Sequence, residues 1–285
     1  MAVSYLMLTA SVIMFGVQFR LNQIYEKEAG SSTRATLVFI AGYSVVGVAV
    51  LAVINGIRFE TTPFTLLIAA ISAVDFIAYS FFSVKAFSKV NLSLFSIFSM
   101  LGGMLLPFVA GIVFFREGLT IGKILCIVFL IAAVCVTFER KKKKSGLGYC
   151  LLVFFTNGMA GVLSKIFQSA PYPKTNEAMY SILCAAGTGL IAAVSLLFVK
   201  GEKVRLNKKI IISMAGYGAL NRVANYLLLL ALAVLPASVQ YPFVTGGVMV
   251  VSFLIGLLTH QKPTKRELFS VLLSGCGIAA LMVFA

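Results

Sequence analysis

Glu139-Arg140-Lys141-Lys142-Lys143-Lys144 is the stretch that divides this chain of 285 residues into two halves of similar length. On both sides of it the sequence is almost continuously apolar, so that 60% of all residues are hydrophobic and only 12% are charged. Soluble globular domains have about 45–50% apolar and about 25% charged residues. The composition therefore excludes a soluble domain. The five cysteines form no CxxC pair and are expected to be small buried apolar side chains.

Five apolar runs precede the basic stretch and five follow it. Each is close to the length of about 20 residues that a membrane helix needs. The alternating pattern of a membrane β-barrel is absent, and backbone groups in hydrocarbon must be satisfied within their own segment. We therefore predict an all-α integral membrane protein with ten transmembrane helices. The predicted helices cover residues 3–23, 36–57, 64–86, 93–115, 119–138, 147–168, 177–199, 209–232, 237–258 and 267–284.

The two halves resemble each other at a nearly constant offset. Leu101-Gly102-Gly103-Met104 matches Thr245-Gly246-Gly247-Val248, which lies 144 positions later. The spacing of Ser11, Phe15, Gln18 and Asn22 recurs 146 positions later in Asn157, Gly161, Ser164 and Gln168. We predict two five-helix repeats, residues 1–138 and 147–285, joined by a basic linker at 139–146. An odd number of helices per repeat makes the halves antiparallel, which is the inverted-repeat plan of secondary transporters.

Several short motifs resemble the drug/metabolite transporter superfamily, in its ten-helix EamA-like branch. They are Arg20 near the end of the first helix, Ala86-Phe87, Leu105-Leu106-Pro107 and Glu117-Gly118-Leu119-Thr120. The second half departs from the family pattern, since Gln261 stands where the family usually has an acid. The resemblance implies two inverted repeats of five helices and secondary transport of a small metabolite.

The basic residues of the loops predict an orientation. Four of them lie in loops on the side of the chain termini, whereas sixteen lie in the opposite loops. The positive-inside rule therefore places the loop with the lysine run in the cytoplasm and both termini outside. The family resemblance implies the reverse, with termini inside. The strong positive charge is attributed to topology and contact with anionic lipid, and no nucleic-acid partner is expected.

Two charged residues occupy the middle of predicted helices. Asp75 lies near the centre of the third helix and Arg222 near the centre of the eighth. Charge at that depth is costly, so each residue needs either a partner or a function. Because the third and eighth helices occupy equivalent positions in the two predicted repeats, we expect Asp75 and Arg222 to face each other. Two interpretations stay open: a structural ion pair, or a gating and substrate site in which Asp75 carries a coupling proton.

Polar side chains near these charges predict a cavity. Ser72, Asp75 and Tyr79 share one helix face, and Asn221, Arg222, Asn225 and Tyr226 crowd six positions of another helix. An acid and a base in one pocket would suit a zwitterion, or an anion bound by the arginine. The predicted substrate site comprises Asp75, Tyr79, Asn221, Arg222, Asn225 and Tyr226, with Gln18, Asn157 and Tyr241 beside them; Asp75 and Arg222 are also the predicted coupling or gating residues.

Other residues receive structural interpretations. Arg20 and Lys165, near helix ends, are expected to extend toward the membrane surface. Glu177 is expected to begin the seventh helix, where an acid suits the helix dipole. His260 is the single histidine, and no metal site, cofactor or catalytic residue is predicted. The paired glycines of the fourth and ninth helices and the Gly275-xxx-Ala279 pattern predict close helix contacts.

The function predicted from these features is secondary active transport of a small polar or amphipathic metabolite, as an exporter or exchanger, with the site at the membrane midplane. No GxxxxGK[ST] motif is present, which excludes a P-loop pump. A channel or non-transporting scaffold is the first alternative, and an intramembrane transferase is the second. The expected partners are a small-molecule substrate, the lipid bilayer and a coupling proton. The expected location is the plasma membrane of a bacterial cell.

Overall fold

The computed structural model describes residues 2–30, 32–87, 89, 92–136, 146–201, 204–258 and 264–284. Within these ranges the chain forms ten α-helices and no strand. The helices are α1 (Ala2–Ala29), α2 (Thr33–Ile54), α3 (Pro63–Phe87), α4 (Leu92–Val113), α5 (Ile121–Val136), α6 (Leu147–Ser169), α7 (Glu177–Phe198), α8 (Lys208–Leu232), α9 (Ala237–Leu258) and α10 (Lys265–Val283).

Most helix ends lie within three residues of the predicted ones, and local chemistry explains several of them. Asn176 accepts a hydrogen bond from the backbone of Met179, and Asn207 caps α8 in the same way. Glu177 begins α7 as predicted. The largest deviation is α1, which continues to Ala29 rather than ending at residue 23. Its polar extension is held by bonds between side chains three and four positions apart, such as that from Asn22 to Glu26.

Length and composition indicate an α-helical membrane protein that crosses the bilayer several times. Seven helices in the described ranges are long and apolar enough to span it, namely α1, α2, α3, α6, α7, α9 and α10. Large apolar side chains are exposed in mid-helix, for example Val45 at 70% and Leu190 at 66%. Such surfaces are unfavourable in water and favourable against lipid. Helix α8 is not among the seven because it carries lysines at its start and polar residues at its centre.

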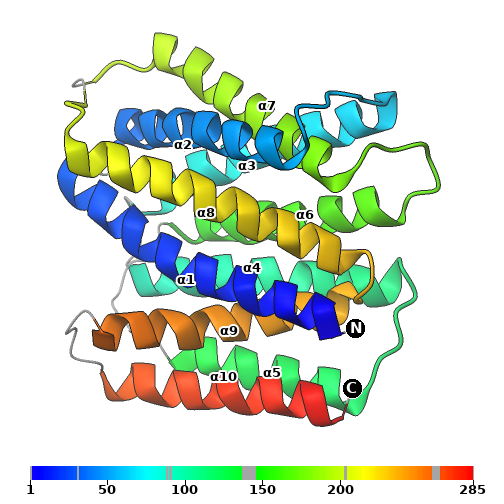
Figure 1. Cartoon of the computed structure of the whole chain (residues 1–285). Coiled ribbons are helices and arrows are strands. Elements are labelled where there is room, and N and C mark those ends of the chain that lie inside the picture. Colours follow the sequence, from blue (N-terminus) through cyan, green and yellow to red (C-terminus); the bar gives the residue numbers. More distant parts are fainter. Residues whose placement is uncertain are drawn as a thin grey trace.

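The helices pack in a regular order (Figure 1). Helix α1 packs against α8 and α9, whereas α6 packs against α3 and α4. Helix α2 packs against α7 and α8, whereas α7 packs against α2 and α3. Each of these contacts of α1 and α2 thus has a counterpart five helices later. The start of α1 and the end of α10 lie on the same side of the bundle (Figure 1).

Helices α5 and α10 lie together at one end of the bundle, away from α2, α3 and α7 (Figure 1). One prediction in this region was wrong. Lys123 was one of the four basic residues assigned to loops on the side of the chain termini, but it lies in α5 with 5% of its surface exposed. Its ammonium group turns back to donate a hydrogen bond to the carbonyl of Gly118. The lysine run, His260 and Gln261 lie outside the described residues.

Candidate functional site

The centre of the candidate site is the buried guanidinium of Arg222 on α8. The residue is 8% exposed, and its guanidinium carbon lies 5.6 Å from the ring centroid of Tyr43 on α2. A Cβ added to Gly47 would lie 2.4 Å from Cγ of Arg222, so the arginine stem crosses α2 where the glycine leaves room. A cation over an aromatic face is stabilised by the ring quadrupole. The Nε and Nη2 atoms are buried and have no hydrogen-bond partner among the described residues.

The expected pairing of Arg222 with Asp75 was wrong. The described residues form ion pairs between Lys165 and Glu117 and between Lys209 and Glu28, and neither involves Asp75 or Arg222. Oδ2 of Asp75 is itself buried without a hydrogen-bond partner. The packing order gives the reason. Helix α8 packs chiefly against α1 and α2, whereas α3 packs chiefly against α6 and α7. Helices α3 and α8 therefore do not pack against each other.

The amide side chains near Arg222 join α8 to α1. Asn221 donates a hydrogen bond of 2.9 Å to Oε1 of Gln18, and both residues are buried. Asn225 donates to the backbone carbonyl of Asn221 at 2.8 Å and is otherwise exposed. The structure therefore brings Gln18, Asn221 and Arg222 into one region, as the sequence predicted for these three.

Tyr79 and Asn157 form a second polar cluster around Ser99 of α4. The hydroxyl groups of Tyr79 and Ser99 are 3.1 Å apart, and Asn157 donates to the carbonyl of Ser99 at 2.7 Å. Phe76 lies between this cluster and Tyr43, with ring centroids 6.5 Å from Tyr43 and 6.2 Å from Tyr79. The predicted site is thus two polar clusters connected by aromatic rings.

The remaining predicted residues lie elsewhere. Tyr226 packs against an apolar cluster of Leu51, Met179 and Ile182, between α2 and α7. Tyr241 of α9 donates a hydrogen bond of 3.0 Å to the carbonyl of Gly161 on α6. Tyr226 thus contacts α2, as Arg222 does, but within an apolar cluster. Tyr241 belongs to a separate network.

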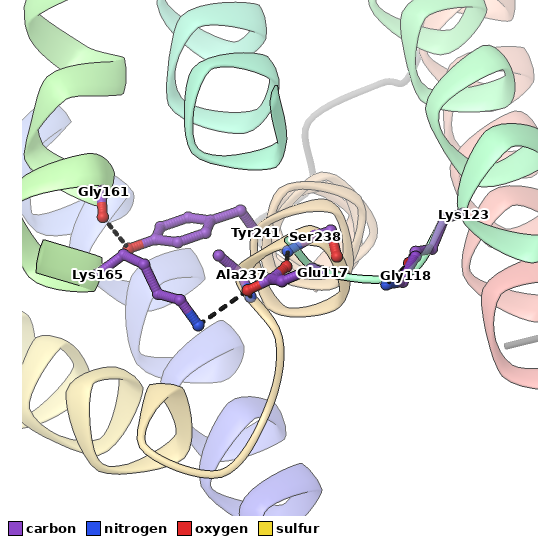
Figure 2. A network of polar contacts seen from close by, with 8 residues as sticks. All are labelled: Glu117, Gly118, Lys123, Gly161, Lys165, Ala237, Ser238 and Tyr241. Carbon is purple, nitrogen blue, oxygen red and sulfur yellow. Dashed lines mark hydrogen bonds and ion pairs between the residues drawn. The ribbon is translucent and has the colours of Figure 1, made fainter. Parts of the chain in front are cut away.

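That network is centred on Glu117, in the segment between α4 and α5 (Figure 2). Oε1 of Glu117 lies 2.8 Å from Nζ of Lys165 on α6 and accepts a 2.8 Å hydrogen bond from the backbone N–H of Ala237. Oε2 accepts another, also 2.8 Å, from the N–H of Ser238. We call these groups the Glu117 clasp: the carboxylate, the ammonium of Lys165 and the two N–H groups that begin α9.

The Glu117 clasp is buried and well satisfied. The side chains of Lys165 and Glu117 are 12% and 8% exposed. Burial opposes ionisation of Glu117, but hydrogen bonds from Lys165, Ser238 and Ala237 outweigh it and hold the pKa of the carboxyl below its usual range. The N–H groups at the start of α9 have no carbonyl partner within the helix, and together with the helix dipole they favour an anion at this position.

Sequence reasoning missed the clasp. Lys165 was expected to extend toward the membrane surface. This was wrong, because its ammonium group is buried in an ion pair with Glu117 from the other half of the chain. The available signals were an acid in one loop, a base near a helix end and a helix start after Pro236. Nothing in their spacing shows that the three segments meet.

A surface hollow lies at the opposite end of α8 from the clasp. Its volume is about 450 Å³, and it is formed by the last turns of α1 and the first turns of α8. Arg20, Lys27 and Lys209 line it together with Glu28, which pairs with Lys209 at 3.0 Å. Lys165 thus lies in a buried ion pair at one end of the bundle, whereas Arg20 lines an open hollow at the other.

Comparison with known proteins gives the fold alone. No family model matches this chain, and no curated protein matches it. Among solved structures, 28 chains match. One of them, described only as a crystal structure of a protein, aligns with a TM-score of 0.79 at 14% sequence identity, over 97% of this chain and 95% of its own. The arrangement of helices is therefore shared with a known structure over almost the whole chain.

The unpaired Asp75 makes a stability prediction. Because its buried Oδ2 has no partner, Asp75→Asn is expected to leave the melting temperature in detergent unchanged or to raise it by about 2–4 °C. Breaking a buried ion pair would instead cost about 3–5 kcal/mol. Differential scanning fluorimetry of the two purified proteins distinguishes these results, and a large loss of stability in the variant would contradict the structure at this position.

Proposed function

We propose that this protein is a secondary transporter, an exporter or exchanger of a small polar or amphipathic metabolite. The observation that carries the proposal is the unpaired, 8% exposed guanidinium of Arg222 at the centre of a helix surrounded by apolar ones. A charge at that depth without a structural partner is a functional group by default. Asp75, near the middle of α3, also has a buried oxygen without a partner and is the second such group.

The proposed architecture is ten transmembrane helices in two inverted repeats, residues 1–138 and 147–285. The contacts of α1 recur in α6, and those of α2 recur in α7. This recurrence supports the repeats, because a duplicated unit repeats its contacts. The resemblance of Leu105-Leu106-Pro107 and Glu117-Gly118-Leu119-Thr120 to the drug/metabolite transporter superfamily supports the same plan. We place the protein in the plasma membrane of a bacterial cell.

Alternating access requires contacts between the repeats to break on one side at a time. The Glu117 clasp is such a contact, since Glu117 belongs to the first half while Lys165, Ala237 and Ser238 belong to the second. The segment between α4 and α5, which carries Glu117, lies on the same side of the bundle as both chain ends (Figure 1). We propose that the clasp closes this side, and that the hollow beside Arg20 marks the side from which the interior is reached.

Counterflow in proteoliposomes tests the proposal. Vesicles are loaded with one unlabelled compound from a panel of amino acids, nucleosides, sugars and quaternary amines, and the labelled compound is added outside. A transporter accumulates label transiently above equilibrium for its own substrate, whereas a channel gives only downhill flux. Failure of every compound that stabilises the purified protein to show counterflow would argue for the channel or scaffold.

The coupling role proposed for Asp75 has its own expected result. Asp75→Asn cannot release a proton, so it should keep counterflow but lose accumulation driven by a proton gradient. The parent protein should do both. Gradient-driven accumulation that survives in Asp75→Asn would remove Asp75 from the proton path.

A further inference from the structure

The free atoms of Arg222 form one edge of its guanidinium group. Nε and Nη2 are adjacent, and their N–H bonds point in nearly the same direction, away from the arginine stem. These are the two atoms that lack partners among the described residues. An arginine edge of this kind matches the two oxygens of a carboxylate, which accepts both N–H bonds at once. The unsatisfied part of Arg222 is therefore a complete two-point binding group.

The position of Arg222 holds this edge in place. The stem passes Gly47 at a distance that excludes even a methyl group there, and one face of the guanidinium covers the ring of Tyr43. With 8% of its surface exposed, the arginine remains away from bulk water. An ionised group buried without a partner costs several kcal/mol. An anion bound at the free edge of the guanidinium would offset that energetic cost, so the site favours a negatively charged ligand.

Two hydroxyl groups of α2 lie in the same region without partners. Tyr43 is 1% exposed and Ser44 is 2% exposed, and the hydroxyl oxygen of each has no hydrogen-bond partner among the described residues. Gly47 follows Tyr43 by four residues, so these two share the helix face that Arg222 crosses, whereas the side chain of Ser44 lies against Gly189 of α7. The hydroxyl of Tyr43 is a donor suited to an anion, and the ring that carries it contacts the guanidinium.

The surroundings select among anions. Arg222 supplies one positive charge, and the ring faces and Asp75 add none, so a singly charged group is favoured over a doubly charged phosphate. The ring of Tyr43 is packed by Phe39, Phe76 and Tyr217, with centroids 5.2, 6.5 and 5.0 Å away. These rings give the region an apolar, aromatic wall suited to the uncharged part of a ligand.

We propose that the substrate of this protein is a monocarboxylate with an apolar or aromatic body, and that its carboxylate binds the Nε–Nη2 edge of Arg222 beside Tyr43. This inference rests on the proposed transport function and names the substrate class of its site.

The test uses the purified full chain and four probes: 3-phenylpropionate, its uncharged amide, phenylphosphonate and phenylalanine. Binding is measured by isothermal titration calorimetry at pH 7. The carboxylates are expected to bind, the amide and phosphonate at least tenfold more weakly. Arg222→Lys keeps the charge but loses the two adjacent N–H groups, and is expected to weaken carboxylate binding at least tenfold. Tyr43→Phe should weaken carboxylate binding less. Equal binding of acid and amide, or a phosphonate preference, overturns the proposal.

A second measurement needs no variant at Arg222. Phenylglyoxal modifies arginine, and mass spectrometry of peptides measures the rate at each position. 3-Phenylpropionate is expected to slow modification of Arg222 severalfold without changing that of the exposed Arg58. Equal rates at Arg222 with and without the carboxylate overturn the proposal even if Arg222→Lys does not fold.

The same probes separate this proposal from the transport function. If a nucleoside or sugar shows counterflow that is unaffected by Tyr43→Phe and by added carboxylate, the transport function stands and the carboxylate proposal fails. If 3-phenylpropionate binds and protects Arg222 but no compound shows counterflow, the carboxylate site stands and the transport function fails.

Discussion

Glu117→Gln is expected to lower the free energy of unfolding by about 3–5 kcal/mol, because it leaves the ammonium of Lys165 buried without a counter-charge. It also removes the anion that satisfies the first N–H groups of α9. In detergent, this corresponds to a fall in melting temperature of roughly 10 °C. Scanning fluorimetry of the purified variant measures it directly.

Two controls make this result specific. Glu28→Gln breaks an ion pair that also joins two helices, but Lys209 is 71% exposed, so the fall in melting temperature is expected to be much smaller than for Glu117→Gln. Adding Lys165→Met to Glu117→Gln removes the stranded charge and should restore part of the lost stability. A Glu117→Gln protein that melts with the parent would show that the clasp contributes nothing.

The loss of stability in Glu117→Gln is expected to depend on pH, because the carboxyl group of Glu117 titrates. The folded protein holds the pKa of Glu117 below its ordinary value of 4.5, so ionisation stabilises the fold. The contribution is fully present above about pH 4.5 and is lost as the pH falls through the lower pKa of the folded state. The difference in melting temperature between the parent and Glu117→Gln should therefore be constant near neutrality and shrink in acid.

Gly102→Ala is expected to destabilise the protein by about 3 kcal/mol, because α4 and α6 touch at this point through their backbones. A Cβ on Gly102 would lie 2.1 Å from the carbonyl oxygen of Phe154, and a backbone atom can move away only if a helix moves. Across the contact, a Cβ on Gly158 would lie 2.5 Å from the carbonyl oxygen of Gly102. Overpacking of this kind typically costs about 1–3 kcal/mol and exceeds that where backbone must shift.

Gly275→Ala on α10 is the matched control, since no atom lies within 4 Å of the added Cβ. Alanine is a better helix former than glycine by about 1 kcal/mol, so this variant should melt at the same temperature or higher. The sequence pattern had grouped Gly275 with Gly102 as close contacts, and for Gly275 this was wrong. Equal losses in both variants would contradict the packing of α4 on α6.

The sequence alone determined the helices. The apolar runs and the acid at Glu177 are local signals, and the ten helices begin and end close to where those signals placed them. Hydropathy likewise determined that the chain is a multi-pass membrane protein. The sequence also identified Asp75 and Arg222 as charges in the middle of apolar helices, because the cost of such a charge depends on its depth along a single helix and not on the neighbours.

Only the tertiary structure decided which side chains meet. Arg222 lies over Tyr43 and not beside Asp75, because α2 packs against α8 where the repeat pattern had led us to expect α3. Lys165 pairs with Glu117 because a loop from the other half reaches the end of α6. Periodicity defines which face of a helix is polar, but the partner of that face depends on the order in which ten similar apolar helices pack. In lipid that order is set by small residues and a few polar contacts, not by hydropathy.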